Sequence, residues 1–173
     1  DSVISKDTGD TTIGIKIRSP YINLKEIIKD HGVIAYSSNF PLYGDISARV
    51  MEILRISTPA IEVYSIDEAF IDFREVPDNE ISAIGHSLIK KIRKGVGIPV
   101  SIGVSKTKTL AKVATKLSKQ YPSTKGFCLM SKESDISRVL KKFPVEDVWG
   151  IGRAHSKMLA SYGVSTAYEF ILK

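Results

Sequence analysis

The chain has 173 residues, 43% of them hydrophobic, and 25 Lys and Arg against 19 Asp and Glu, a formal net charge of +6 that favours a polyanionic partner. Cys128 is the single cysteine, which excludes an internal disulfide and a multi-cysteine zinc site and fits a reducing compartment. Without a signal-peptide pattern or an apolar run of roughly 20 residues, the chain is expected to be cytoplasmic.

The N-terminal part of the chain predicts little regular structure. Residues 1–20 are rich in Asp, Thr and Gly around positions 7–12, a composition typical of loops. A short helix is expected over Leu24–Asp30, followed by a strand over Val33–Tyr36. A longer helix is then predicted over about Leu42–Ile56, where apolar residues recur at helical spacing.

The middle of the chain alternates between strand and helix patterns. Residues 61–66 and 69–73 are rich in β-branched and aromatic residues and are separated by two acids, which predicts a hairpin. A helix with apolar spacing from Ile81 to Ile92 follows, and then a strand over Pro99–Val104. This order predicts an α/β (α+β) fold, a ferredoxin-like βαββαβ unit that lacks its first strand.

Beyond this unit, an amphipathic helix is predicted over Thr107–Lys119, with apolar residues on one face and lysines on the other. A short strand and a helical tail follow, with a boundary near residue 131.

Asp67 and Glu68 form the predicted tip of the hairpin. A turn brings consecutive carboxylates to one rim of a sheet and offers the hard oxygen ligands that Mg²⁺ prefers. Such a pair suits a two-metal phosphoryl-transfer site, in which ions roughly 4 Å apart stabilise the attacking and leaving groups. Taken alone, these two residues favour the alternative interpretation, ordinary acids in a solvated turn.

The predicted lysine helix carries no acid between Val104 and Tyr121. Its charges are therefore not neutralised by sequence neighbours, which suits a phosphate backbone. A solvated helix face is the alternative interpretation. The basic residues are Lys106, Lys108, Lys112, Lys116 and Lys119.

The segment Trp149–Arg153, with glycines at 150 and 152, leads into a predicted helix. Glycines in a tight connection leave backbone N–H groups free to face a phosphate at a helix N-terminus, as in a helix-hairpin-helix element. Such elements hold duplex DNA without reading its sequence. The alternative is a helical corner whose glycines serve packing.

The string Tyr64–Asp72 closely resembles the second catalytic-carboxylate motif of Y-family translesion DNA polymerases. Further segments resemble this family in the same order: Ser37–Met51 its palm-to-fingers return, and Gly103–Lys112 its strand-to-lysine-helix signature. Val145–Gly152 is similar to the UmuC-like (ImpB/MucB/SamB) group in particular.

The resemblance implies a fingers remnant over residues 1–38, a catalytic palm over 39–131 and a partial helix-hairpin-helix thumb over 132–173. The parent would add deoxynucleotides (dNTPs) to a primer 3′ end by Mg²⁺-dependent, two-metal catalysis, in DNA repair and the SOS response. Expected partners are primer-template DNA, dNTP and, for the full-length protein, a UmuD-like accessory protein, a RecA filament and a sliding clamp.

The same resemblance assigns roles to individual residues. Asp67 and Glu68 would be the catalytic metal ligands, and Lys119 would contact the incoming triphosphate. The expected DNA-binding residues are Lys106, Lys108, Lys112, Gly150, Gly152 and Arg153.

The chain departs from the family pattern in three respects. The first strand, which supplies another metal-binding Asp and the aromatic ribose gate, is not in the sequence, and the chain opens at Asp1 without Met. The family's triphosphate-contacting Tyr and Arg should fall near Thr8–Thr11, which contains neither. The sequence also stops within the thumb-like region, at Lys173. We therefore expect a piece of a longer protein that does not polymerise alone.

Two other functions remain open at this point. A nucleotidyl or dinucleotide cyclase has a similar palm with paired acids on a hairpin, and would convert GTP without a primer. A non-catalytic DNA-binding scaffold would bind duplex without extending it.

Overall fold

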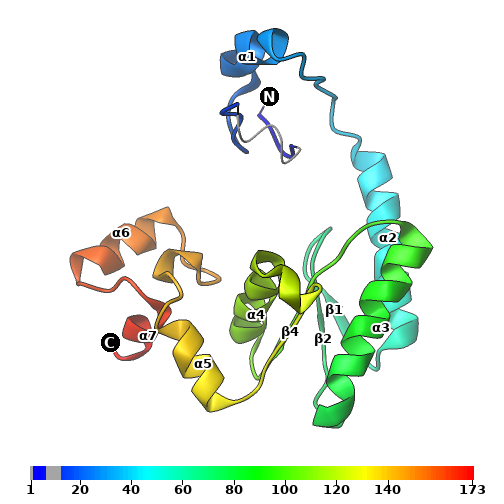
Figure 1. Cartoon of the computed structure of the whole chain (residues 1–173), viewed down its shortest axis with the longest axis vertical. Coiled ribbons are helices and arrows are strands. Elements are labelled where there is room, and N and C mark those ends of the chain that lie inside the picture. The colour runs from blue at the N-terminus through cyan, green and yellow to red at the C-terminus, as the bar shows by residue number, and fades with distance from the viewer. Residues whose placement is uncertain (1, 7–12) are drawn as a thin grey trace. The chain divides into compact units, whose positions relative to one another are not determined.

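The computed structural model describes residues 2–6 and 13–173, which form two compact units, Asp1–Phe40 and Pro41–Lys173 (Figure 1). In the first unit, the 3-10 helix η2 (Tyr21–Leu24) continues into α1 (Lys25–Asp30). Gly32 has φ of 62°, a left-handed conformation that glycine adopts without steric cost, so the predicted helix end is confirmed. The loop expected around residues 7–12 lies outside the described residues.

The strand expected over Val33–Tyr36 is wrong. Residues 33–39 have no regular secondary structure, and the side chains of Ile34 and Tyr36 are 72% and 85% exposed. A strand forms only where a neighbouring backbone accepts its hydrogen bonds, and no described strand pairs with this segment. The β-branched residues of this segment favour an extended backbone, but no described strand lies beside it to form the hydrogen bonds of a sheet.

Two long helices build one side of the second unit. Helix α2 (Phe40–Ser57) buries Val50 and Leu54 on the predicted apolar stripe, and α3 (Asp78–Val96) buries Leu88 and Ile92. These residues share one apolar cluster, which explains why both helices keep a 3.6-residue apolar period. Both predicted helices are confirmed.

The strands form two small sheets in the described residues. Strands β1 (Ile61–Val63) and β2 (Ala69–Ile71) pair antiparallel as the predicted hairpin, and β3 (Ile102–Ser105) pairs in parallel with β4 (Phe127–Met130). Neither strand of the hairpin is hydrogen-bonded to β3 or β4, although Ile71 and Ile102 pack on the same cluster. The mixed α/β class is confirmed, while the single ferredoxin-like sheet is not formed by these residues. Periodicity predicts strands but not which strands pair.

Helix α4 (Lys108–Gln120) is capped by Thr107, whose side chain accepts a hydrogen bond from Leu110 N–H. A side chain at Gly103 in β3 would overlap backbone atoms of α4 around Thr115. Glycine at this position therefore lets the helix lie directly on the strand.

The C-terminal region consists of α5 (Glu133–Leu140), the 3-10 helix η4 (Val145–Asp147), α6 (Arg153–Ser161) and α7 (Ala167–Ile171). One apolar cluster joins this region to α4 and β4, through Val113, Ala114, Met130, Ile136, Leu140, Phe143 and Ala167. Residues on both sides of the boundary expected near 131 thus share a core, and the three-domain assignment stays a prediction. Among the described helices, none combines the length and apolar character of a bilayer span.

Candidate active site

The tip of the β1–β2 hairpin comprises residues 64–68. The backbone N–H groups of Tyr64 and Ser65 both donate to the carbonyl of Glu68, at 3.0 Å each, and close the turn. Asp67 is exposed, and its Oδ1 accepts a hydrogen bond of 2.7 Å from the hydroxyl of Ser65. Both acids therefore lie at the hairpin tip, as predicted.

The two neighbouring carboxylates have different surroundings. Glu68 forms an ion pair with Lys112 of α4, and its side chain is 39% exposed. The ammonium of Lys112 also lies over two aromatic rings, 5.8 Å from the centre of Tyr64 and 5.9 Å from that of Trp149. Asp67 faces solvent beside a neutral hydroxyl, whereas Glu68 lies against α4 beside a cation.

The basic residues at and just before α4 have no acid among their sequence neighbours, but the tertiary structure brings acids to most of them. Four of the five basic residues in this region form ion pairs with acids remote in sequence: Lys106 with Glu133, Lys108 with Glu62, Lys112 with Glu68 and Lys116 with Asp147. The hairpin and the C-terminal region bring these acids to the helix. Lys119 is the one lysine of α4 to which the described residues supply no acid.

Three aromatic rings connect the hairpin to the C-terminal region. The ring centres of Tyr64 and Trp149 lie 5.3 Å apart, those of Phe70 and Trp149 5.6 Å, and those of Tyr64 and Phe70 5.8 Å. Lys108 lies 5.1 Å from the centre of the Phe70 ring. Such edge-to-face and tilted contacts stabilise packing beyond burial alone. Trp149 thus packs against the hairpin, and its partners there were not predictable from sequence spacing.

Asp72 does not belong to the tip. Arg74 donates hydrogen bonds from its side chain and its backbone N–H to the carboxylate of Asp72, and these bonds lower the pKa of Asp72 to about 2. The carboxylate is therefore ionised and already paired at neutral pH.

The donor set at the tip suits a magnesium ion held together with a nucleotide. Mg²⁺ is commonly bound through one or two carboxylates plus substrate phosphates and water. Asp67 and Glu68 supply two such carboxylates, and the described residues contain no group of three or more possible side-chain ligands. The tip therefore fits a shared ion and offers no complete cage of protein ligands.

The glycine segment before α6 combines a turn with an uncapped helix start. Gly150 has φ of 91°, which favours glycine, whereas Gly152 has φ of −86° and precedes the first residue of α6, Arg153, without a side-chain cap. The first N–H groups of α6 therefore lack a capping side chain from Gly152, consistent with the predicted phosphate contact.

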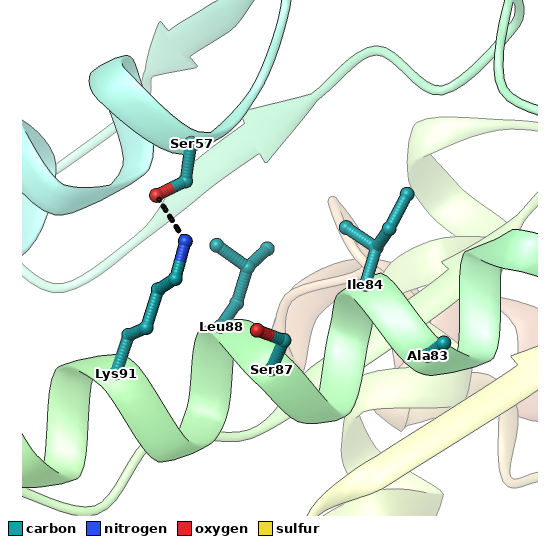
Figure 2. Close-up of a pocket in the computed structure, with 6 residues that line it drawn as sticks. All are labelled: Ser57, Ala83, Ile84, Ser87, Leu88 and Lys91. Atoms are coloured by element: carbon teal, nitrogen blue, oxygen red, sulfur yellow. Dashed lines mark hydrogen bonds between the residues drawn. The ribbon is translucent and has the colours of Figure 1, made fainter.

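A shallow hollow of about 300 Å³ lies elsewhere, between the end of α2 and α3. Figure 2 shows Lys91 reaching across it to donate a hydrogen bond of 3.4 Å to Ser57. The hollow is lined by Ser57, Ala83, Ile84, Ser87, Leu88 and Lys91. None of the predicted site residues lines it, so it is not part of the candidate site.

Comparison with known proteins decides the family. The family model described as impB/mucB/samB family matches residues 10–116, more than half of the chain. The chain belongs to the impB/mucB/samB family. The membership expected from the resemblance of Tyr64–Asp72 and Val145–Gly152 to known motifs is confirmed.

Members of the impB/mucB/samB group are among the relatives of this chain. Protein UmuC of Salmonella typhimurium is 39% identical over 159 residues, which cover 91% of this chain and 38% of that protein. Protein MucB of Escherichia coli is 31% identical over 157 residues, covering 90% and 37%. The DNA polymerase IV of Moorella thermoacetica is 33% identical over 141 residues, covering 80% and 34%. The chain thus spans less than two fifths of the length of these relatives.

Solved structures share the fold. The insertion ternary complex of Dbh DNA polymerase matches with a TM-score of 0.81 at 24% identity, over 96% of this chain and 47% of that one. The crystal structure of DinB from Sulfolobus solfataricus gives a TM-score of 0.80 at 24% identity, over 99% and 52%. At this identity the likeness establishes the arrangement of elements, and the roles of individual residues stay predictions.

Proposed function

We propose that the full-length protein containing this chain is a template-directed DNA polymerase that adds deoxynucleotides to a primer 3′ end opposite damaged bases. The observation that carries the proposal is the pair Asp67 and Glu68 at a hairpin tip, beside the lysine-bearing helix α4, in a chain of the impB/mucB/samB family. The solved polymerase structures that share this fold support it.

In this proposal, Asp67 and Glu68 hold Mg²⁺ at the tip. Bound there, the metal would neutralise phosphate charge and activate the attacking hydroxyl. Lys119, which lacks an acid partner in the described residues, binds the triphosphate. Two contacts hold Glu68: the backbone N–H groups of Tyr64 and Ser65 donate to its carbonyl, and Lys112 pairs with its carboxylate.

Duplex DNA is held by sequence-independent contacts to phosphate. Lys108 and Lys112 lie on the same helix as Lys119, and Lys106 lies just before it. The start of α6 contributes Gly150, Gly152 and Arg153. Backbone N–H groups at such a helix start attract a phosphate, which is the role of a helix-hairpin-helix thumb. Residues 39–131 would form the palm in this scheme, with the fingers remnant before it.

The 173-residue chain by itself is expected not to extend a primer. Its described residues bring two acids to the tip, and a two-metal centre with a missing carboxylate leaves charge uncompensated and geometry unfixed. The accessory protein, RecA filament and sliding clamp would act on the full-length protein.

The test is primer extension by the full-length protein with Asp67→Ala. We expect the extension rate to fall at least about 100-fold, because the tip loses a metal ligand, while circular dichroism stays unchanged. Asp72→Ala is a matched control on the same hairpin, because the Asp72 carboxylate is already bonded to Arg74. Near-normal extension by Asp67→Ala would show that Asp67 is not a ligand.

The same preparation separates the other two functions. Duplex binding without extension by the wild-type protein would indicate a non-catalytic scaffold. Conversion of GTP without a primer would indicate a cyclase.

A further inference from the structure

The contact between Lys112 and Glu68 differs from the other ion pairs of α4. Lys112 is the least exposed of the paired lysines, at 25%, compared with 48% for Lys108. Its partner is one of the two acids proposed to bind metal, whereas Lys108 pairs with Glu62, within strand β1. One of the two candidate metal ligands, Glu68, is therefore already paired with an internal cation.

An ammonium group and a divalent cation compete for the same carboxylate. The oxygen that accepts from Lys112 has fewer lone pairs available for a metal ion, and a second positive charge nearby repels that ion. Partial burial strengthens this repulsion, because water screens it less. A cation that binds Glu68 therefore competes with the ammonium, which occupies Oε1 of the carboxylate.

The ammonium of Lys112 contacts two aromatic rings in addition to Glu68, and these contacts do not depend on the carboxylate. The rings of Tyr64 and Trp149 lie 5.8 and 5.9 Å from the Lys112 ammonium, and aromatic faces attract cations. Trp149 is the only tryptophan of the chain, so its fluorescence reports on this position.

We infer that Lys112 is a positioning residue that holds Glu68 in the cation-free protein, leaves it when a divalent cation binds, and thereby sets the cation affinity of the hairpin tip. This inference rests on the proposed metal-binding role of Glu68 and adds the residue that competes with it. Lys112 thus has a role at the carboxylate in addition to any contact with DNA.

The test is a Mn²⁺ titration of the 173-residue chain without nucleotide, in which electron paramagnetic resonance measures the free ion. Lys112→Met should bind Mn²⁺ about fivefold more tightly than wild type, because the competitor and its charge are both removed. Lys112→Arg keeps the ion pair and should restore the wild-type affinity. Lys108→Met is the matched control, because it removes an equal charge one turn away without freeing Glu68, and should change the affinity less.

A second readout uses the unmutated chain. Adding Mg²⁺ should shift the emission of Trp149 as Lys112 leaves Glu68, and the shift should disappear in Lys112→Met and persist in Lys112→Arg. If the wild-type emission does not respond to Mg²⁺ at concentrations that saturate binding, Lys112 does not move and the inference is wrong.

The outcomes separate this inference from the proposed function. If Glu68→Gln weakens Mn²⁺ binding but Lys112→Met leaves it unchanged, Glu68 is a ligand and the competition is refuted. If Glu68→Gln has no effect on Mn²⁺ binding in either background, the metal-binding role fails and the inference fails with it.

Discussion

Helices α3 and α4 carry similar runs of basic residues, but in the folded protein the basic residues of only one of them form ion pairs with described acids. The sequence contains no acid between Glu80 and Glu133, so both runs are uncompensated locally. In α4, tertiary ion pairs engage the lysines at 108, 112 and 116. In α3, Lys90, Lys91, Arg93 and Lys94 have no ion pair with any described acid. The number of basic residues along a helix in the sequence therefore does not predict how much of its positive charge stays unpaired in the folded protein.

The reason lies in what packs on each helix. The hairpin and the C-terminal region approach α4, and both carry acids. Helix α3 lines the hollow of Figure 2, where Lys91 donates a hydrogen bond to the hydroxyl of Ser57 and forms no ion pair with a described carboxylate. Arg93 and Lys94 lie in the last turn of α3, where the helix dipole favours positive charge without a partner.

The two helices also differ in what they meet at a close glycine contact, and this difference yields the largest expected effect. Gly103 meets the backbone of α4, while Gly85 of α3 meets the ring of Phe127. Gly103→Ala should lower the free energy of unfolding by about 3 kcal/mol or more, because a backbone cannot move aside as a ring can. Gly85→Ala should cost less, about 1–2 kcal/mol, since overpacking is partly offset by better helix propensity.

Urea unfolding of both variants measures these changes. A Gly103→Ala variant as stable as wild type would show that α4 can shift away from β3. If Gly85→Ala were the more damaging substitution, the contact of α3 with Phe127 would be the less adaptable one.

A smaller effect is expected on duplex binding. Glu133→Gln removes the partner of Lys106 and should strengthen binding of duplex DNA by the chain, with a log–log salt slope steeper by roughly 1. Glu80→Gln is the matched control, because it changes the net charge equally without releasing Lys106. Fluorescence anisotropy at several salt concentrations measures both. Equal effects of the two substitutions would mean that net charge alone matters and that the ion pair does not restrain Lys106.

The smallest effect concerns stability. Lys108→Gln removes an exposed ion pair with Glu62 and should lower the free energy of unfolding by about 0.5 kcal/mol. Lys90→Gln in α3 breaks no ion pair and should change it by less, within about 0.5 kcal/mol of zero. Thermal unfolding of both variants checks this. A loss well above 1 kcal/mol for Lys108→Gln would indicate that its position over Phe70 stabilises the hairpin more than the ion pair does.

Much of the local structure was predictable from the sequence. The hairpin with its acids at the tip, the helices α2, α3 and α4, and the glycine turn before α6 follow from patterns within short segments. The strand at residues 33–36 was not, because strand formation depends on a partner. The contacts of Glu68 with Lys112 and of Tyr64 with Trp149 could not be predicted either, because the two residues of each pair are far apart in the sequence.

The sequence by itself determined the family, the helical periods, and the position of Asp67 and Glu68 in a turn, because each depends on adjacent residues or on a contiguous motif. Only the tertiary structure decided which lysines are neutralised, which strands pair and which cation lies on Glu68. Those features require segments distant in the chain to meet, and the free energy of their contacts depends on burial and distance, which a linear pattern does not contain.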